Sequence, residues 1–239
     1  MLKVLELFSG TGSVSKVCKE LGYECLSIDL YLPADINIDI LEWDYKKYPK
    51  DSFDIIWASP PCVEYSLLKV SNLNQKVKGE ILTKEKIEKN MNEADKLVSK
   101  ALEIIEYFNP HWWFMENPAT GRLKNRDVVK GLDWYDVDYC MYCDWGYRKR
   151  TRIWTNRKDF EPLKCDGSGD CGNMIEIPTN GAMRHDTGQP IKSATRKLHI
   201  NNLGNSSILS MFRQMKIKCG TTTHERYRIP PNLIFSLLT

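Results

Sequence analysis

The chain has 239 residues, of which 42% are hydrophobic and 27% charged, a composition typical of a globular domain with its own core. Its formal net charge is only +3, so overall charge does not indicate a nucleic-acid-binding protein, and any such surface has to come from local clusters of Lys and Arg. No apolar run reaches the roughly 18–20 residues that a membrane span needs. The N-terminus lacks the architecture of a signal peptide, so we expect a cytoplasmic protein that does not bind membranes.

The first part of the chain predicts the alternating strands and helices of a parallel α/β sheet. A helix is expected at 13–22, directly after a glycine-containing turn, with Gly22 as its end. Apolar runs typical of strands lie at 3–8, 23–30, 36–40 and 53–59.

The middle of the chain predicts one further helix and three further strands. Residues 67–92 are polar and rich in lysine, which indicates a mobile loop. Residues 93–109 carry an apolar stripe with the period of an amphipathic helix. The additional strands are expected at 111–118, 135–143 and 151–156.

From about residue 157 the composition shifts to Gly, Pro, Asn and Asp, which indicates a separate small module. The last stretch, 226–239, predicts a helix that starts at Pro230 and Pro231 and packs back onto the first domain. The expected organisation is a first domain at 1–156, a small module at 157–225 and the C-terminal helix at 226–239.

Polar residues stand at the ends of four predicted strands: "FSGTGS", Asp29, "SPPC" and "ENP". Ligands of open parallel sheets bind beyond the carboxyl ends of the strands, so we expect these residues at one edge. Gly10 and Gly12 allow a tight turn, and the helix that follows offers free N–H groups. Ser15 stands where the dinucleotide fingerprint has a third glycine, and Asp29 is placed to hold a ribose.

Two residues at this edge are candidates for chemistry. Cys62 follows two prolines at a strand end, where a thiolate can add to an electron-poor ring, although a buried structural cysteine is the alternative. Glu116 follows an apolar strand, where burial can raise the pKa of its carboxyl group until it shares a proton with a ring nitrogen. A helix cap or a salt bridge is the alternative for Glu116.

The motifs "LFSGTGS", "SPPCVEYS", "MENP" and "RKRTRIW" occur in the order and spacing of the cytosine-C5 DNA methyltransferase family, which this sequence resembles over residues 3–155. The resemblance implies an S-adenosylmethionine-dependent methyltransferase with a Rossmann-like α/β fold, a mostly parallel sheet and a small irregular target-recognition module. It also implies methyl transfer to C5 of cytosine in DNA through a covalent bond between Cys62 and C6 of a flipped-out base.

The resemblance assigns roles to individual residues. Cys62 would be the nucleophile, Glu116 the acid that engages N3 of cytosine, and Asn117 the residue that positions it. Arg150 and Arg152 match the paired arginines that hold the target base and the nearby phosphate. The implied binding residues for S-adenosylmethionine are Phe8, Ser9, Gly10, Thr11, Gly12, Asp29, Leu30, Asp39, Ile40 and Pro60.

The sequence departs from the family pattern at three places. Arg148 replaces the usual Gln, Pro118 the usual Val, and Tyr227-Arg228 the usual Gly-Asn before the last helix. The catalytic residues do not identify the sugar, so an RNA cytosine-C5 methyltransferase stays an alternative, and a non-catalytic nucleic-acid-binding module is a third. An enzyme acting on exocyclic amines is disfavoured, because no aromatic residue follows Pro61.

The small module carries two further features. Cys165, Cys171 and His185, with the "CMYC" at 140–143, could form a structural zinc site. We favour thiols without metal, because the spacing is unusual and Cys140 and Cys143 would face roughly opposite sides of a predicted strand. A predicted phosphate-contacting surface consists of Arg184, Lys192, Arg196, Lys197, Arg213, Lys216 and Lys218.

The partner expected from these features is double-stranded DNA, bound by a monomer, and pairing with a restriction nuclease would suit such an enzyme. No metal is expected in the catalytic centre.

Overall fold

The computed structural model describes residues 1–77, 80–145, 148–168, 171–176, 183–185 and 227–239. The chain divides into two compact units. The first consists of Met1–Asp136 and Thr151–Phe160, and the second of Val137–Arg150 and Glu161–Thr239.

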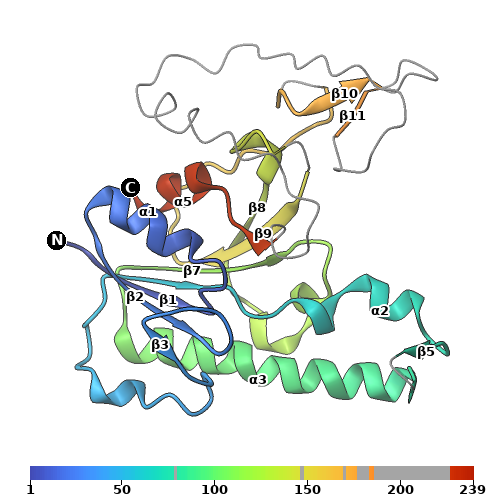
Figure 1. The fold of residues 1–239 in the computed structure, drawn as a ribbon, viewed down its shortest axis with the longest axis horizontal. Coiled ribbons are helices and arrows are strands. Elements are labelled where there is room, and N and C mark those ends of the chain that lie inside the picture. Colours follow the sequence, from blue (N-terminus) through green and yellow to red (C-terminus); the bar gives the residue numbers. More distant parts are fainter. Residues whose placement is uncertain (78–79, 146–147, 169–170, 177–182, 186–226) are drawn as a thin grey trace. The chain divides into compact units, whose positions relative to one another are not determined.

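A seven-stranded sheet in the order β3-β2-β1-β4-β7-β9-β8 is the framework of the fold (Figure 1). Its first five strands pair in parallel, and β9 is antiparallel to β7. The predicted α/β fold with a mostly parallel sheet is therefore confirmed. The strands are β1 (Lys3–Leu7), β2 (Glu24–Asp29), β3 (Ile36–Asn37), β4 (Ile55–Ala58), β7 (Trp112–Pro118), β8 (Trp134–Asp138) and β9 (Arg150–Thr155).

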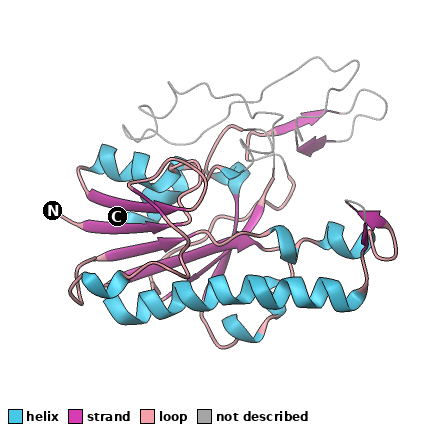
Figure 2. Cartoon of the chain, turned by 60° about the horizontal axis from the view of Figure 1, so that its bottom comes forward, coloured by secondary structure: helices cyan, strands magenta, loops and turns pink. Residues whose placement is uncertain are grey.

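The two main helices of the first unit cover opposite sides of this sheet (Figure 2). Helix α1 (Ser13–Leu21) ends at Gly22, whose φ of 71° is readily adopted only by glycine. Helix α3 (Lys84–Phe108) buries its apolar stripe in the main core, where the Phe108 ring meets Phe53 edge-on at 5.0 Å. Strand β4 is buried along its whole length, which explains its uninterrupted apolar sequence.

The segment predicted as a loop at 67–92 is in part regular structure. Helix α2 (Leu67–Ser71) and the short antiparallel strands β5 (Lys76–Val77) and β6 (Glu80–Ile81) precede α3. Helix α3 begins at Lys84, well before residue 93, because the Thr83 side chain caps it by accepting a hydrogen bond from the N–H of Lys86 at 3.2 Å.

The strand predicted at 135–143 ends at Asp138, and a 3₁₀ turn follows at Tyr139–Met141. The expectation that Cys140 and Cys143 lie in a strand and face opposite sides is therefore wrong. Other 3₁₀ turns lie at Tyr45–Lys47, Val63–Tyr65, Leu123–Asn125 and Asp127–Val129.

The second unit contains the antiparallel pair β10 (Met174–Glu176) and β11 (Met183–His185), and helix α5 (Pro231–Leu238). The predicted C-terminal helix exists and has a proline in its first turn; its packing onto the first domain stays a prediction. Most of the predicted module at 157–225, including nearly all of its basic surface, lies outside the described residues. Among the described helices, none is both long and apolar enough to span a membrane.

Candidate active site

Four adjacent strands bring the predicted polar residues to one edge of the sheet. Strands β2, β1, β4 and β7 are neighbours in the order and run parallel, so their carboxyl ends lie side by side. Asp29 ends β2, the turn 8–12 follows β1, the segment 60–62 follows β4, and Glu116 and Asn117 stand near the end of β7.

The turn after β1 is built from alternating left-handed residues. Phe8, Gly10 and Gly12 have φ angles of 57°, 55° and 64°. A Cβ atom added to Gly12 would meet nothing within 4 Å, so its backbone conformation, and not crowding by the protein, requires glycine. Phe8 adopts the same left-handed conformation, which destabilises a residue with a side chain by about 1 kcal/mol or more. The turn therefore leaves open space beside its backbone.

Asp29 holds this turn in place. Its Oδ2 accepts a hydrogen bond from the N–H of Gly10 at 2.8 Å, and its Oδ1 accepts from the N–H groups of Tyr31 and Leu32 at 2.9 and 2.8 Å. One carboxylate thus links the turns after β1 and β2, the two that are predicted to bind the cofactor.

The other predicted cofactor residues lie in the same unit. Leu30 is 44% exposed, Ile40 is buried, and Pro60 is buried directly after β4. Asp39 shapes the turn that follows β3 by accepting a hydrogen bond from the N–H of Leu41 at 2.9 Å.

Glu6 belongs to β1, and its side chain caps the first turn of α1. Its carboxylate accepts hydrogen bonds from the N–H groups of Val14 and Ser15 at 3.1 and 3.0 Å, and from the Ser15 hydroxyl. Burial raises the pKa of Glu6, and these hydrogen bonds oppose the rise. The expectation that these helix N–H groups are free for a ligand is therefore wrong. The signal in the sequence is an acid inside an apolar strand.

Cys62 lines a cavity of about 270 Å³ just after β4. The same cavity is lined by Asn117 and Pro118 at the end of β7, so the structure brings two of the predicted motifs together. The remaining lining residues are Ser66, Leu67, Leu68, Thr120 and Gly121.

Glu116 and Asn117 are both buried, at 8% and 1% exposure. The Asn117 side-chain amide donates a hydrogen bond to the carbonyl oxygen of Pro60 at 2.9 Å, which ties the end of β7 to the segment that carries Cys62. In the register with β9, Asn117 lies opposite Arg152 and Glu116 opposite Ile153.

Each predicted arginine has a carboxylate partner within its own unit. Arg152 makes two hydrogen bonds to Asp136, at 2.8 and 3.0 Å, and its guanidinium lies 3.4 Å from the centre of the Trp134 ring. Arg150 makes two to the fully buried Asp138, at 3.0 and 2.7 Å. The alternation of acids along β8 was the signal for these pairs, which were not predicted.

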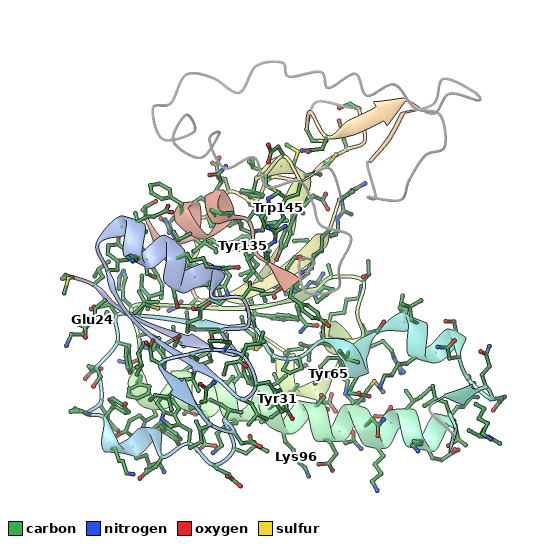
Figure 3. All side chains as sticks on the ribbon, in the orientation of Figure 1. Glu24, Tyr31, Tyr65, Lys96, Tyr135 and Trp145 are labelled. Carbon is green, nitrogen blue, oxygen red and sulfur yellow. The ribbon has the colours of Figure 1, made fainter. Side chains whose placement is uncertain are left out.

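The segment after Cys62 is anchored by a polar network that sequence reasoning missed. The hydroxyl group of Tyr65 (Figure 3), which is fully buried, donates to Asp95 of α3 at 2.9 Å. Arg126 donates to the other oxygen of Asp95 at 2.9 and 2.7 Å. Burial and the Asp95 hydrogen bond raise the pKa of Tyr65. The carbonyl oxygen of Tyr65 also accepts from the N–H of Arg122 at 2.9 Å.

The strand order, with an antiparallel strand beside β7, and the glycine turn after β1 agree with the α/β fold of S-adenosylmethionine-dependent methyltransferases that the sequence resemblance implies. Residues 2–128 match the family model described as C-5 cytosine-specific DNA methylase. A curated relative from Frog virus 3 (isolate Goorha), named "Probable DNA (cytosine-5)-methyltransferase", is 39% identical over 239 residues, which cover 99% of each chain. This chain belongs to the C-5 cytosine-specific DNA methylase family.

Solved structures also resemble the chain. The S. pombe Dnmt2 methyltransferase is 14% identical with a TM-score of 0.43, over 69% of this chain and 52% of its own. A mutant of Spodoptera frugiperda DNMT2 is 17% identical with a TM-score of 0.40, over 70% of this chain and 56% of its own. The chain thus matches about half the length of these proteins.

Proposed function

We propose that this member of the family methylates C5 of cytosine in double-stranded DNA through a transient bond between Cys62 Sγ and C6 of the base, which is rotated out of the helix. The observation that carries the proposal is that Cys62 and Asn117 line the same cavity, with Glu116 adjacent in sequence to Asn117. Unstacking the base costs a few kcal/mol, and contacts around it would offset that cost.

The turns after β1 and β2 fit S-adenosylmethionine. The open space beside Gly12 permits a ligand to approach the backbone, and the Asp29 carboxylate is fixed where a ribose could share it. In this proposal Phe8–Gly12 hold the methionine part, Asp29 and Leu30 lie at the ribose, and Asp39 and Ile40 border the adenine. The bound cofactor supplies an electrophilic methyl group.

The residues of this chain would make C5 reactive. Attack of the Cys62 thiolate on C6, with a proton delivered to N3 from Glu116, converts the ring into an enamine whose C5 is nucleophilic. After methylation, loss of the C5 proton to solvent and return of the N3 proton to Glu116 restore the C5–C6 double bond and expel the thiolate. Positioned proton transfer of this kind is commonly worth about 10²–10⁴ in rate. The paired arginines, Arg150 and Arg152, would hold the base and its phosphate.

The test is covalent capture on a duplex that contains 5-fluorocytosine, because fluorine cannot leave as the C5 proton does. With S-adenosylmethionine present, wild-type protein should form a denaturation-resistant complex with this duplex. Cys62→Ser should form none while it still binds the cofactor, and Cys25→Ser, which changes a thiol outside the cavity, should be captured like wild type. Absence of a wild-type adduct would rule out the covalent mechanism.

An RNA substrate is the second candidate, because nothing among Cys62, Glu116 and Asn117 reads the sugar. Labelled-methyl transfer to duplex DNA and to tRNA distinguishes the two. We expect transfer to DNA, and transfer to tRNA alone would replace the DNA proposal. A protein inert on both would be the non-catalytic binding module.

The proposal also covers the cellular compartment, the oligomeric state and pairing with a nuclease. No disulfide joins the cysteines that the structure describes, which fits a reducing compartment such as the cytoplasm. We further propose action as a monomer, to be measured by sedimentation on DNA. Pairing with a restriction nuclease predicts that methylated DNA resists cleavage by an extract of the same source.

A further inference from the structure

Three cysteines of the second unit, far apart in the sequence, place their sulfur atoms together. The Sγ atoms of Cys140, Cys165 and Cys171 all lie within 4.8 Å of one another. Cys140 and Cys165 are buried, at 2% and 4% exposure, and Cys171 is half-buried. Tetrahedral zinc–thiolate geometry, with Zn–S bonds of about 2.3 Å, separates sulfurs by about 3.8 Å, so small side-chain movements would suffice.

The backbone around two of these sulfurs, those of Cys140 and Cys171, is held by one side chain. The buried Asn173 amide nitrogen donates to the carbonyl oxygens of Cys140, Cys143 and Cys171, at 2.7, 2.8 and 2.9 Å. Asn173 thus connects the 3₁₀ turn after β8 to the turn that contains Cys171. Hydrogen bonds that hold the backbone in this way keep the thiols in position to bind a metal ion.

Cys165, the remaining cysteine of the cluster, is held by a different side chain. The N–H of Cys165 donates to Oδ2 of Asp138 at 2.9 Å, and Asp138 is fully buried. Asp138 is held in turn by Arg148 and Arg150. All three thiols therefore stand on segments held by hydrogen bonds, two of them to Asn173 and one to Asp138.

The electrostatics of the cluster suit a cation. Three thiolates whose sulfur atoms lie this close together would repel one another, and a divalent soft cation between them removes that penalty. The strands β10 and β11 have only three residues each, and a small module of this kind gains most from a metal staple.

We propose that Cys140, Cys165 and Cys171 bind a structural zinc ion. Each thiol loses its proton to solvent as its sulfur–zinc bond forms, and no electron is transferred. Cys143, which follows Cys140 in a C-x-x-C, is the candidate for the fourth ligand, although its Sγ donates to the carbonyl oxygen of Tyr139 at 3.1 Å in this structure. The sequence-based set already contained these three cysteines, together with Cys143 and His185, but thiols without metal were favoured there; the clustered sulfurs now favour the metal.

Metal analysis of the full chain, purified without chelator from zinc-supplemented medium, tests the proposal. One zinc per chain is expected for wild type and for Cys25→Ser, a cysteine change outside the cluster. Cys165→Ser and Cys171→Ser should each lose most of the metal. Metal-free wild-type protein, equal zinc in the cluster variants, or a disulfide among these cysteines by non-reducing mass analysis would overturn it.

Cobalt substitution keeps the test decisive if a serine variant fails to fold. Wild-type protein stripped of metal and titrated with Co²⁺ should show the intense thiolate-to-metal absorption of a tetrahedral site, saturating at one equivalent. Cys143→Ser should weaken this absorption if Cys143 is the fourth ligand, and leave the three-thiolate spectrum if water or another residue completes the site. A spectrum of hexa-aquo cobalt alone would contradict the proposal.

Discussion

Gly12 and Gly22 border the same helix and have similar backbone angles, but only Gly12 belongs to the turn that is predicted to bind the cofactor. Their φ angles are 64° and 71°, and a Cβ on either would meet nothing within 4 Å. Gly12→Ala and Gly22→Ala should therefore destabilise the fold equally, by about 1–2 kcal/mol, through left-handed strain. Only Gly12→Ala should also weaken S-adenosylmethionine binding, because its methyl group enters the open space of the turn.

The measurement combines urea unfolding with calorimetric titration of the cofactor. Equal losses of cofactor affinity in the two variants would show that the turn after β1 acts through stability alone. In that case close approach of the ligand to Gly12 would be excluded.

At the scale of elements, Tyr65 fastens the segment that carries Cys62 to α3. Tyr65→Phe removes the hydrogen bond to Asp95, and we expect a loss of about 1 kcal/mol in stability. It should also slow covalent capture and lower kcat with little change in the KM for cofactor, because Tyr65 would position Cys62 without touching the cofactor.

Tyr107→Phe is the matched control for this positioning role. Tyr107 lies on α3, the helix that carries Asp95, and its hydroxyl donates to the carbonyl oxygen of Tyr48 at 3.0 Å. Its loss should cost similar stability and leave capture kinetics unchanged. If both variants slow capture in proportion to their stability, Tyr65 has only a structural role.

The ionisation of the Asp138 carboxyl group should make part of the free energy of unfolding depend on pH. Burial alone would raise its pKa, but hydrogen bonds from Arg150, Arg148 and the N–H of Cys165 together lower it. Since the folded-state pKa lies below the unfolded value of about 3.9, Asp138 contributes stability that is fully present above that pH and lost as pH falls through the folded pKa.

Asp138→Asn should therefore destabilise the protein at neutral pH, by about 2 kcal/mol, and this difference should shrink in acid. Urea unfolding between neutral pH and about pH 3 measures it. Asp133→Asn, which removes an exposed partner of Lys158, should stay within about 1 kcal/mol of wild type. A constant difference for Asp138→Asn across this range would contradict the assignment.

The elements that could be predicted are those whose signal is local. The parallel strands, α1 and the edge residues follow from apolar runs closed by Gly, Asp and Pro. The start of α3 was missed because its first turns are polar and lysine-rich, although Ile87, Met91 and Ala94 continue the apolar spacing. The thiol cluster was named from the sequence but disfavoured, in part because Cys140 was placed in a strand. The 3₁₀ turn at Tyr139–Met141 depends on tertiary hydrogen bonds, such as that from the N–H of Tyr139 to the carbonyl oxygen of Lys149, which have no local signal.

At the scale of the whole molecule, a formal net charge of +3 leaves DNA affinity to local basic clusters. The predicted surface between Arg184 and Lys218 lies almost entirely outside the described residues and stays a prediction. If it contacts phosphates, Arg213→Ala and Lys216→Ala should each reduce the slope of log K against log salt concentration by about 1.

The control is Lys96→Ala on α3, which removes an exposed lysine paired with Glu93 (Figure 3). This variant should keep the wild-type slope. Fluorescence anisotropy of a labelled duplex at several salt concentrations gives the slopes, and a flat wild-type response would argue against any basic contact surface.

The carboxylate of Glu6 at the start of α1 has a consequence for selectivity inside a cell. Dinucleotide-binding folds place a pyrophosphate against bare amide groups at this point. Here an internal acid already satisfies two of those amides, and an incoming pyrophosphate would meet both competition and repulsion. Abundant NAD and ATP should accordingly bind poorly beside the turn after β1, and a nucleoside without a phosphate chain should be preferred there.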